Sequence, residues 1–279
     1  MSNSAQRDFW SGPSGNPWVD FQPRMDATLA PVLEAVMARV APQPGQAVLD
    51  VGCGTGASLI AAAGAVGREG RVTGLDISPV LLGLARRRTE ALPQVEVIEG
   101  DAAEVRVDRV HDLLISRFGV MFFDDTAAAF RNISRNLRPG AHLVMAAWAP
   151  AGQNPWWMDP AAAARARVGT PPKVDRTQPG PFAWEDAERV TRMLCEAGLE
   201  EVAVENTQVH LTPPGDARDA ARDCTRIGSA ASVLNHFDAG EEDRQAVEDA
   251  LAEVFSQYET NDGMRIPARI NLVTARVPA

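Results

Sequence analysis

The sequence predicts an α/β fold in which a Rossmann-like, doubly wound, seven-stranded sheet is mostly parallel and ends in an antiparallel strand. Three observations support this fold class. Between residues 47 and 148, short apolar segments alternate with segments of helical period. A glycine-rich turn, from Gly52 to Gly56, follows the first apolar segment. After Trp148, two strand patterns flank two helical patterns, which indicates strands that pair antiparallel at one edge of the sheet.

The N-terminal segment differs from the rest. Residues 1–24 are rich in glycine, proline and aromatic residues and have no sustained helical period, so we expect an irregular arm that packs on another part of the protein. From Leu29 to Val40 the apolar residues recur at helical spacing. We expect this helix to be capped by Asp26 or Thr28, with Pro31 inside its first turn, where proline is tolerated.

The alternating pattern then predicts the elements of the sheet core in order. The expected strands are 47–51, 71–75, 95–98, 112–116 and 141–147, and the expected helices are 56–66, 79–91 and 126–137. Ser78 followed by Pro79 is a helix start, because serine caps and proline suits the first helical position. The tripeptide 138–140, Arg-Pro-Gly, is the matching helix stop.

After Trp148 the pattern loosens into a proline-rich passage that reaches Pro181. The remaining expected elements are a helix over 184–197, a strand over 201–211, helices over 217–237 and 241–258, and a last strand over 268–277.

Composition and charge narrow the classes of function. The chain has 279 residues, 45% of them hydrophobic, which is enough for a large core. A net charge of −10 disfavours nucleic acid and anionic membranes as partners, and no apolar run approaches the ~20 residues of a membrane span. Cys53, Cys195 and Cys224 are odd in number and far apart, so we expect no disulfide framework and no metal site. The first residues lack the apolar segment of a secretory signal, and we expect a cytoplasmic protein.

The glycine-rich turn is the most informative segment for function. Its glycines let the backbone approach a ligand closely at the carboxyl edge of the sheet. Gly52 and Gly54 with Ala57 also satisfy the dinucleotide fingerprint, so the glycines alone do not identify the ligand. Asp50 separates the alternatives, because a carboxylate repels a pyrophosphate and attracts the ammonium and sulfonium groups of S-adenosylmethionine.

Two further acids follow the next two strands. Asp76, after the second strand, is placed to accept hydrogen bonds from both hydroxyls of a ribose. Asp101, after the third strand, is placed to accept one from an adenine amino group. Either residue alone is equally well explained as a turn or cap residue, but their joint placement favours a nucleoside ligand.

Together these motifs resemble the class I S-adenosylmethionine-dependent methyltransferases, and within them the small-molecule branch that includes the ubiquinone- and menaquinone-biosynthesis enzymes. The matching segments are 48–56, 74–78, 100–102, 116–123 and 137–140, within about residues 45–148. The resemblance implies that Gly52 and Gly54 line the methionine part of the cofactor, Asp76 holds the ribose and Asp101 holds the adenine. It also implies cofactor contacts by Cys53, Ile77, Ala102, Ser116 and Arg117.

The acceptor side is less well determined. Methyl transfer mainly requires alignment of acceptor, methyl and sulfur, but a hydroxyl or carbon acceptor also requires a general base. His210 and His236 are the candidates for that base, since both lie in the late segments. Trp18, Phe118 and Trp156 are the candidate substrate contacts, and simple anchoring of proline-rich loops is the alternative explanation for the tryptophans.

We therefore expect an enzyme that methylates a small organic molecule on oxygen, carbon or nitrogen and releases S-adenosylhomocysteine. It is expected to be one integrated domain in three parts: an arm and lid helix (1–44), a cofactor-binding core (45–150), and substrate-side insertions, lid helices and last strands (151–279). We expect a monomer or homodimer whose partner is the acceptor. A non-catalytic cofactor-binding module is the alternative, followed by an NAD(P)-dependent oxidoreductase, which Asp50 and the absence of a Tyr-x-x-x-Lys pair disfavour.

Overall fold

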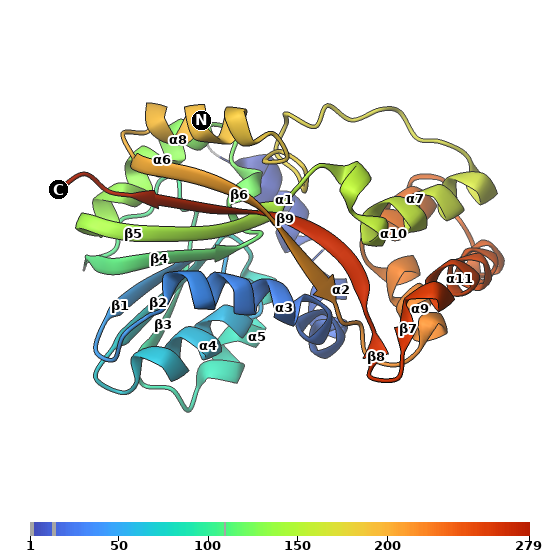
Figure 1. Ribbon diagram of the computed structural model, residues 1–279, viewed down its shortest axis with the longest axis horizontal. Coiled ribbons are helices and arrows are strands. Elements are labelled where there is room, and N and C mark those ends of the chain that lie inside the picture. The colour runs from blue at the N-terminus through green and yellow to red at the C-terminus, as the bar shows by residue number, and fades with distance from the viewer. Residues whose placement is uncertain (1–2, 13–14, 109) are drawn as a thin grey trace.

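The computed structural model describes residues 3–12, 15–108 and 110–279, and its centre is one seven-stranded sheet (Figure 1). The strand order is β3-β2-β1-β4-β5-β9-β6, and every neighbouring pair from β3 to β5 is parallel. Strand β9 runs antiparallel to both β5 and β6. The bounds are β1 Ala47–Val51, β2 Arg71–Asp76, β3 Val95–Glu99, β4 His111–Arg117, β5 Leu137–Trp148, β6 Glu200–Leu211 and β9 Ile266–Arg276. The predicted fold class is confirmed.

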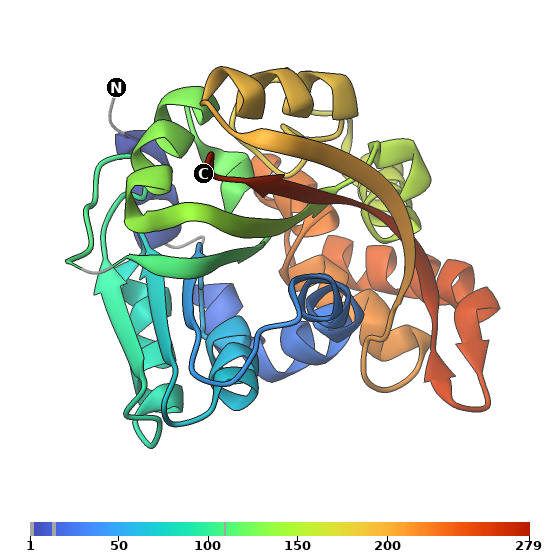
Figure 2. The same cartoon turned by 60° about the vertical axis from the view of Figure 1, so that its left-hand side comes forward.

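Helices cover both faces of this sheet (Figure 2). On one face lie α3 (Gln22–Val40), which packs on β4, β5 and β6, and α4 (Ala57–Val66) and α5 (Pro79–Thr89), which pack on β1, β2 and β3. On the other face lie α6 (Thr126–Ile133) and α8 (Ala187–Glu196), which contact each other. The central strands are buried on both sides, as a doubly covered parallel sheet requires.

Two local predictions in the core had different outcomes. The predicted start of α5 is confirmed, and the predicted helix stop before β5 is wrong. Ser78 caps α5, since its Oγ accepts a hydrogen bond from the amide of Leu81 at 3.3 Å. The expected helix stop at 138–140 is wrong, because these residues already belong to β5. Leu137 pairs with His111 of β4, so sheet pairing begins before the proline, and a short 3-10 turn (Ser134–Asn136) separates the strand from α6.

The expectation of an irregular arm is also wrong. Helices α1 (Ser4–Ser11) and α2 (Asn16–Asp20) occupy this segment, and both pack against α5. Short helices gain most of their stability from such packing, which the local sequence does not reveal. The third helix begins at Gln22, earlier than expected, so neither Asp26 nor Thr28 caps it.

Pro31 therefore lies inside α3 and not in its first turn. A proline there cannot donate to the carbonyl four residues earlier, which is that of Ala27. The structure satisfies this carbonyl from outside the helix, because the hydroxyl of Thr212 donates to it at 2.9 Å. The amide of Thr212 donates to the carbonyl of Thr28 at 3.2 Å. The end of β6 thus replaces the bond that the proline removes.

The late segments form a helical subdomain beside the sheet (Figure 1). It contains α7 (Pro155–Val168), α9 (Ala217–Arg226), α10 (Ser229–His236), α11 (Glu241–Phe255) and a hairpin of β7 (Glu259–Thr260) and β8 (Gly263–Met264). Helix α7 was not predicted from the proline-rich passage, although Pro155 suits its first turn. The helix expected over 217–237 is split at Gly228, which has a positive φ of 96°.

No helix among the described residues is long and apolar enough to cross a membrane.

Candidate functional site

The glycine-rich turn after β1 has the strained geometry that only glycine adopts easily. Gly52, Gly54 and Gly56 have φ values of 72°, 53° and 91°. A Cβ on Gly52 would lie 2.4 Å from the Cα of Gly119, so the turns after β1 and β4 pack backbone to backbone. A Cβ on Gly54 would meet no atom of the described residues within 4 Å. The turn is therefore closed on the side of Gly119 and open at Gly54.

Asp76, the last residue of β2, holds this turn in place. Its Oδ2 accepts from the amide of Gly54 at 2.8 Å, and its Oδ1 accepts from the amide of Ser78 at 2.9 Å. Each oxygen keeps a lone pair for a further donor. Burial raises the pKa of Asp76 above its usual value, while the backbone amides act in the opposite direction. Ile77 follows half-buried, and Cys53 lies buried in the glycine turn.

Asp101 follows β3 and is 6% exposed. Its Oδ1 accepts from the amide of Ala103 at 2.9 Å and from the side-chain amide of Asn3 at 2.9 Å. Its Oδ2 accepts from the backbone amide of Asn3 at 3.2 Å. Ala102 is buried next to it. Asn3 was missed at the sequence level, because a single asparagine in a segment without periodicity carries no signal of a contact 98 residues away.

Asp50 and Arg117 place two opposite charges in the interior beneath the turn. Asp50 has no exposed surface; its Oδ2 accepts from the hydroxyl of Ser58 at 2.5 Å, and its Oδ1 has no partner among the described residues. Burial raises the pKa of Asp50 to about 7, although the Ser58 hydrogen bond and the charge of Arg117 lower it.

Arg117, the last residue of β4, is the positive member of this arrangement. Its Nη2 lies 3.7 Å from Asp26 of α3, which also pairs with Arg88 at 2.7 Å. Its Nη1 is buried without a hydrogen-bond partner among the described residues. Burial lowers the pKa of Arg117, and the neighbouring carboxylates of Asp26 and Asp50 raise it. Ser116 is already engaged, since its hydroxyl donates to the carbonyl of Val51 at 2.7 Å and accepts from the amide of Gly119 at 3.2 Å.

An aromatic cluster lies just beyond the ends of β4 and β5. Phe118 stacks on Trp148 with ring centroids 4.3 Å apart, and Trp157 contacts Trp148 and Phe182 edge to face at 5.8 and 5.3 Å. Phe118 has a φ of 66°, which is rare for a bulky residue and marks backbone strain. The indole nitrogen of Trp157 is buried with no partner among the described residues. Trp157 was not singled out from the sequence.

Other predicted acceptor-side residues lie outside this cluster. Trp156 is buried and stacks on Phe255 at 6.1 Å, inside the helical subdomain. Trp18 is half-buried in the arm and contacts Trp10 edge to face. His236 is exposed at the end of α10 beside Phe237, and His210 lies near the end of β6 opposite Pro267. Neither imidazole makes a hydrogen bond to a described residue, so their role as bases remains a prediction.

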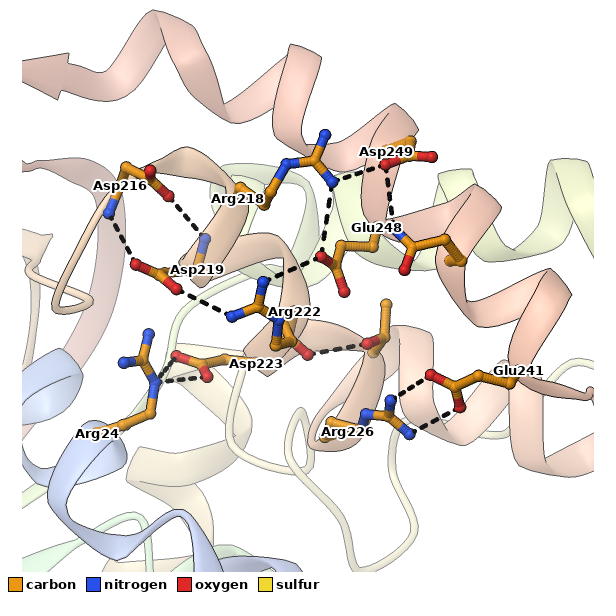
Figure 3. A network of polar contacts seen from close by, with 12 residues as sticks. Arg24, Asp216, Arg218, Asp219, Arg222, Asp223, Arg226, Glu241, Glu248 and Asp249 are labelled. Carbon is orange, nitrogen blue, oxygen red and sulfur yellow. Dashed lines mark hydrogen bonds and ion pairs between the residues drawn. The ribbon is translucent and has the colours of Figure 1, made fainter.

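An ion-pair network attaches α3 to the helical subdomain (Figure 3). The Nε of Arg24 donates to both oxygens of Asp223 in α9 at 2.6 and 2.8 Å, and its Nη2 donates to the carbonyl of Pro214 at 2.9 Å. Burial raises the pKa of Asp223, and the hydrogen bond from Arg24 lowers it.

Within the part of the chain that the structure describes, no three His, Cys, Asp or Glu side chains are grouped to hold a metal ion.

Comparison with known proteins identifies the core. Residues 48–140 match the family described as "Methyltransferase domain". The demethylmenaquinone methyltransferase of Bacillus cereus (strain B4264) is 38% identical over 105 residues, which is 37% of this chain and 44% of that protein. The match therefore spans less than half the length of this curated relative.

Two solved structures share the fold over nearly the whole chain. The Haemonchus contortus phosphoethanolamine N-methyltransferase 2, in complex with S-adenosyl-L-methionine, superimposes with a TM-score of 0.61 at 19% identity, over 100% of this chain and 60% of that one. A structure of the Haloferax volcanii Trm112 methyltransferase activator with a putative methyltransferase gives 0.55 at 18% identity, over 98% and 97%. At these identities the likeness concerns the fold alone.

Proposed function

We propose that the protein transfers a methyl group from S-adenosylmethionine to a small organic acceptor, since residues 48–140 match the methyltransferase-domain family and lie in a doubly wound sheet. One observation carries the proposal. The glycine turn, Asp76 and Asp101 gather at the carboxyl edge of β1, β2 and β3, where doubly wound sheets bind their ligands.

The methionine end of the cofactor fits the buried charges. It carries an ammonium and a carboxylate, and the site has one unpartnered carboxylate oxygen, on Asp50, and one unpartnered guanidinium nitrogen, on Arg117, among the described residues. Burying such atoms without partners is costly, so a zwitterionic ligand near them gains from both charges. A pyrophosphate would be repelled by Asp50, which disfavours the oxidoreductase alternative.

The adenosine end fits the two remaining acids. In this proposal, Asp76 accepts from the ribose hydroxyls with its free lone pairs, and Asp101 accepts from the adenine amino group. Cys53, Ile77 and Ala102 line the same turns as apolar contacts. Gly54 keeps the space beside the sulfonium free of a side chain, and Gly52 lets the turn pack against Gly119.

For the acceptor, we propose a planar or largely apolar molecule. The cluster of Phe118, Trp148, Trp157 and Phe182 supports this assignment, since aromatic walls stack on flat ligands and exclude water. The name of the Bacillus relative points to the same chemical class. The arm and lid helix (1–44) and the late insertions (151–279) would close over the core (45–150).

The role of the chain's own residues in the proposed reaction is to align the acceptor with the methyl group and the sulfur. S-adenosylmethionine, when bound, supplies a methyl group on a positively charged sulfur. The glycine turn and the three acids hold that group at the edge of the sheet, and the aromatic cluster holds the acceptor in line with it. His210 and His236 are retained as proposed bases for a hydroxyl or carbon acceptor, although neither makes a hydrogen bond to a described residue that would orient it.

The direct test is turnover. Purified protein is incubated with S-adenosylmethionine and a panel of quinols, phenols and aromatic amines, and S-adenosylhomocysteine formation is followed by mass spectrometry. Asp76→Ala is the inactive variant, and Asp108→Ala, at an exposed position, is the matched control. Acceptor-dependent product with wild type and Asp108→Ala alone supports the proposal. Cofactor binding with no turnover on any acceptor favours the non-catalytic module, and binding of a nicotinamide cofactor instead favours the oxidoreductase.

A further inference from the structure

The N-terminal arm reaches the adenine side of the proposed site through one residue, Asn3. This residue is 5% exposed, and all its polar atoms are used. Its backbone and side-chain amides both donate to Asp101, and its side-chain oxygen accepts from the amide of Asp124 at 3.0 Å. Its carbonyl accepts from the amide of Arg7 at 2.9 Å, which ties it to α1.

The side chain of Asn3 makes these hydrogen bonds in place of the one that an N-cap asparagine usually makes with its own helix. Asn3 occupies the N-cap position of α1, where asparagine normally accepts a hydrogen bond from the first turn of its own helix. Its side chain makes no such bond in α1. The Asn3 side chain is thus oriented toward Asp101 and does not cap its own helix, which indicates a role beyond starting α1.

A second contact fixes the other end of α1. The carbonyl of Trp10 accepts from the hydroxyl of Ser78 at 2.8 Å, and the amide of Ser78 donates to Asp76. The Trp10 ring also packs edge to face on Phe122 at 5.3 Å. One helix therefore joins the turn after β3, which holds Asp101, to the turn after β2, which holds Asp76.

The hydrogen bonds to Asp101 leave it one free acceptor position. A carboxylate has about four lone-pair positions. Two on Oδ1 are taken by Ala103 and the side chain of Asn3, and one on Oδ2 is taken by the Asn3 amide. The remaining position on Oδ2 suits a single N–H donor.

From these contacts we propose that Asn3 is a positioning residue that makes the adenine subsite selective for the exocyclic amino group, an inference that rests on the proposed function. Asn3 holds the Asp101 carboxylate in one orientation and excludes water from it, so a ligand without the amino group leaves a buried acceptor position unsatisfied. Without Asn3, water reaches the carboxylate and replaces the missing donor, and the penalty for lacking the amino group falls.

The test compares two ligands by calorimetry on the full chain. One is S-adenosylhomocysteine, and the other is its analogue in which hydrogen replaces the adenine amino group. Wild type is expected to favour the first by about tenfold or more, the size typical of a hydrogen bond to a charged group. Asn3→Ala and the isosteric Asn3→Asp, whose side chain cannot donate and repels Asp101, are expected to reduce that ratio about fivefold or more, mainly because water offsets the penalty on the analogue that lacks the amino group. Ser4→Ala, at the exposed neighbouring position, should keep the wild-type ratio.

The outcomes separate the two proposals. If wild type does not bind S-adenosylhomocysteine, the proposed function itself fails. If wild type binds and discriminates but Asn3→Ala weakens both ligands equally, Asn3 only anchors the arm and the inference is overturned. Tighter binding of both ligands to Asn3→Ala also overturns it, because Asn3 would then compete with the ligand. Thermal unfolding of each variant verifies that the fold is kept.

Discussion

Gly52 and Gly119 lie so close that a Cβ on Gly52 would be 2.4 Å from the Cα of Gly119. This approach joins the turns after β1 and β4, the two neighbouring strands at the centre of the sheet. For Gly54, two residues along the same turn, an added Cβ would have no atom within 4 Å in the part of the chain that the structure describes. The two glycines therefore serve different purposes, structural at Gly52 and ligand approach at Gly54.

Alanine at Gly52 should mainly lower stability, whereas alanine at Gly54 should mainly weaken ligand binding. Gly52→Ala forces the backbones apart and should lower the free energy of unfolding by roughly 3 kcal/mol or more. Gly54→Ala meets no clash and should lose only about 1 kcal/mol, the strain of a left-handed residue, yet it should weaken S-adenosylhomocysteine binding at least about tenfold by filling the cradle. Urea unfolding and calorimetry measure the two effects. Equal losses of stability, or unchanged binding to Gly54→Ala, would contradict this assignment.

Asp50 should make both stability and cofactor binding depend on pH. Its pKa is 3.8 in the unfolded reference and about 7 in the fold. Because the raised pKa means that folding favours the protonated acid, this stabilisation is complete below the unfolded value and is lost as pH rises toward about 7. Relative to Asp50→Asn, wild type should lose stability over this range, by an amount on the order of 4 kcal/mol.

Cofactor affinity should change in the opposite direction. Ionised Asp50 attracts the ammonium, so wild-type binding of S-adenosylhomocysteine should tighten from about pH 6 to about pH 8. Asp50→Asn should show little change over that range. Urea titrations and calorimetry across pH follow the two quantities, and a pH-independent difference between wild type and variant would show that Asp50 does not titrate there.

The pair between Arg24 and Asp223 should stabilise the contact between α3 and the helical subdomain. The Asp223 side chain is 2% exposed and that of Arg24 is 32% exposed. Arg24→Met leaves a buried carboxylate without its partner and should cost about 3 kcal/mol of unfolding free energy. Adding Asp223→Leu should recover part of that loss, because the uncompensated charge is removed. Chemical denaturation of the single and double variants measures this, and a double variant less stable than Arg24→Met would argue against it.

Trp157 offers a test of the acceptor site. Its indole nitrogen has no partner among the described residues, so Trp157→Phe removes no hydrogen bond within the described chain and should change stability by less than about 1.5 kcal/mol. With an acceptor from the turnover screen, the variant should raise acceptor KM severalfold and leave cofactor Kd unchanged. Trp156→Phe is the control, since Trp156 packs on Phe255 in the subdomain and should affect stability more than KM. The opposite pattern would move the acceptor site toward Trp156.

The sequence predicted the sheet and its glycine-rich turn because both depend on short-range patterns. Alternating strands and helices, glycines after β1 and acids after β2 and β3 lie within a few residues of the features they specify. The ends of β1, β2 and β4 were correct within one residue. The same reasoning failed for the arm, where helices form through packing on α5, and for Pro31, whose lost bond is replaced by Thr212 far along the chain.

For the proposed site, the sequence indicated the acids at the strand ends and gave no signal of their long-range contacts. Asp50, Asp76 and Asp101 were identified from strand ends, whereas Asn3 reaches Asp101 across 98 residues of sequence. Trp156 was the candidate from the sequence, whereas the structure places its neighbour Trp157 in the aromatic cluster. Adjacent residues on one helix face different neighbours, and only the packing of α7 decides which of them joins the cluster with Phe118 and Trp148.

The most direct test of the central claim is calorimetry of the purified chain with S-adenosylmethionine and S-adenosylhomocysteine, with Asp76→Ala beside wild type. The account predicts one-site binding to wild type with a micromolar Kd, and its loss in a variant that remains folded. Absence of binding to folded wild type, both alone and with the acceptor panel present, would contradict the account.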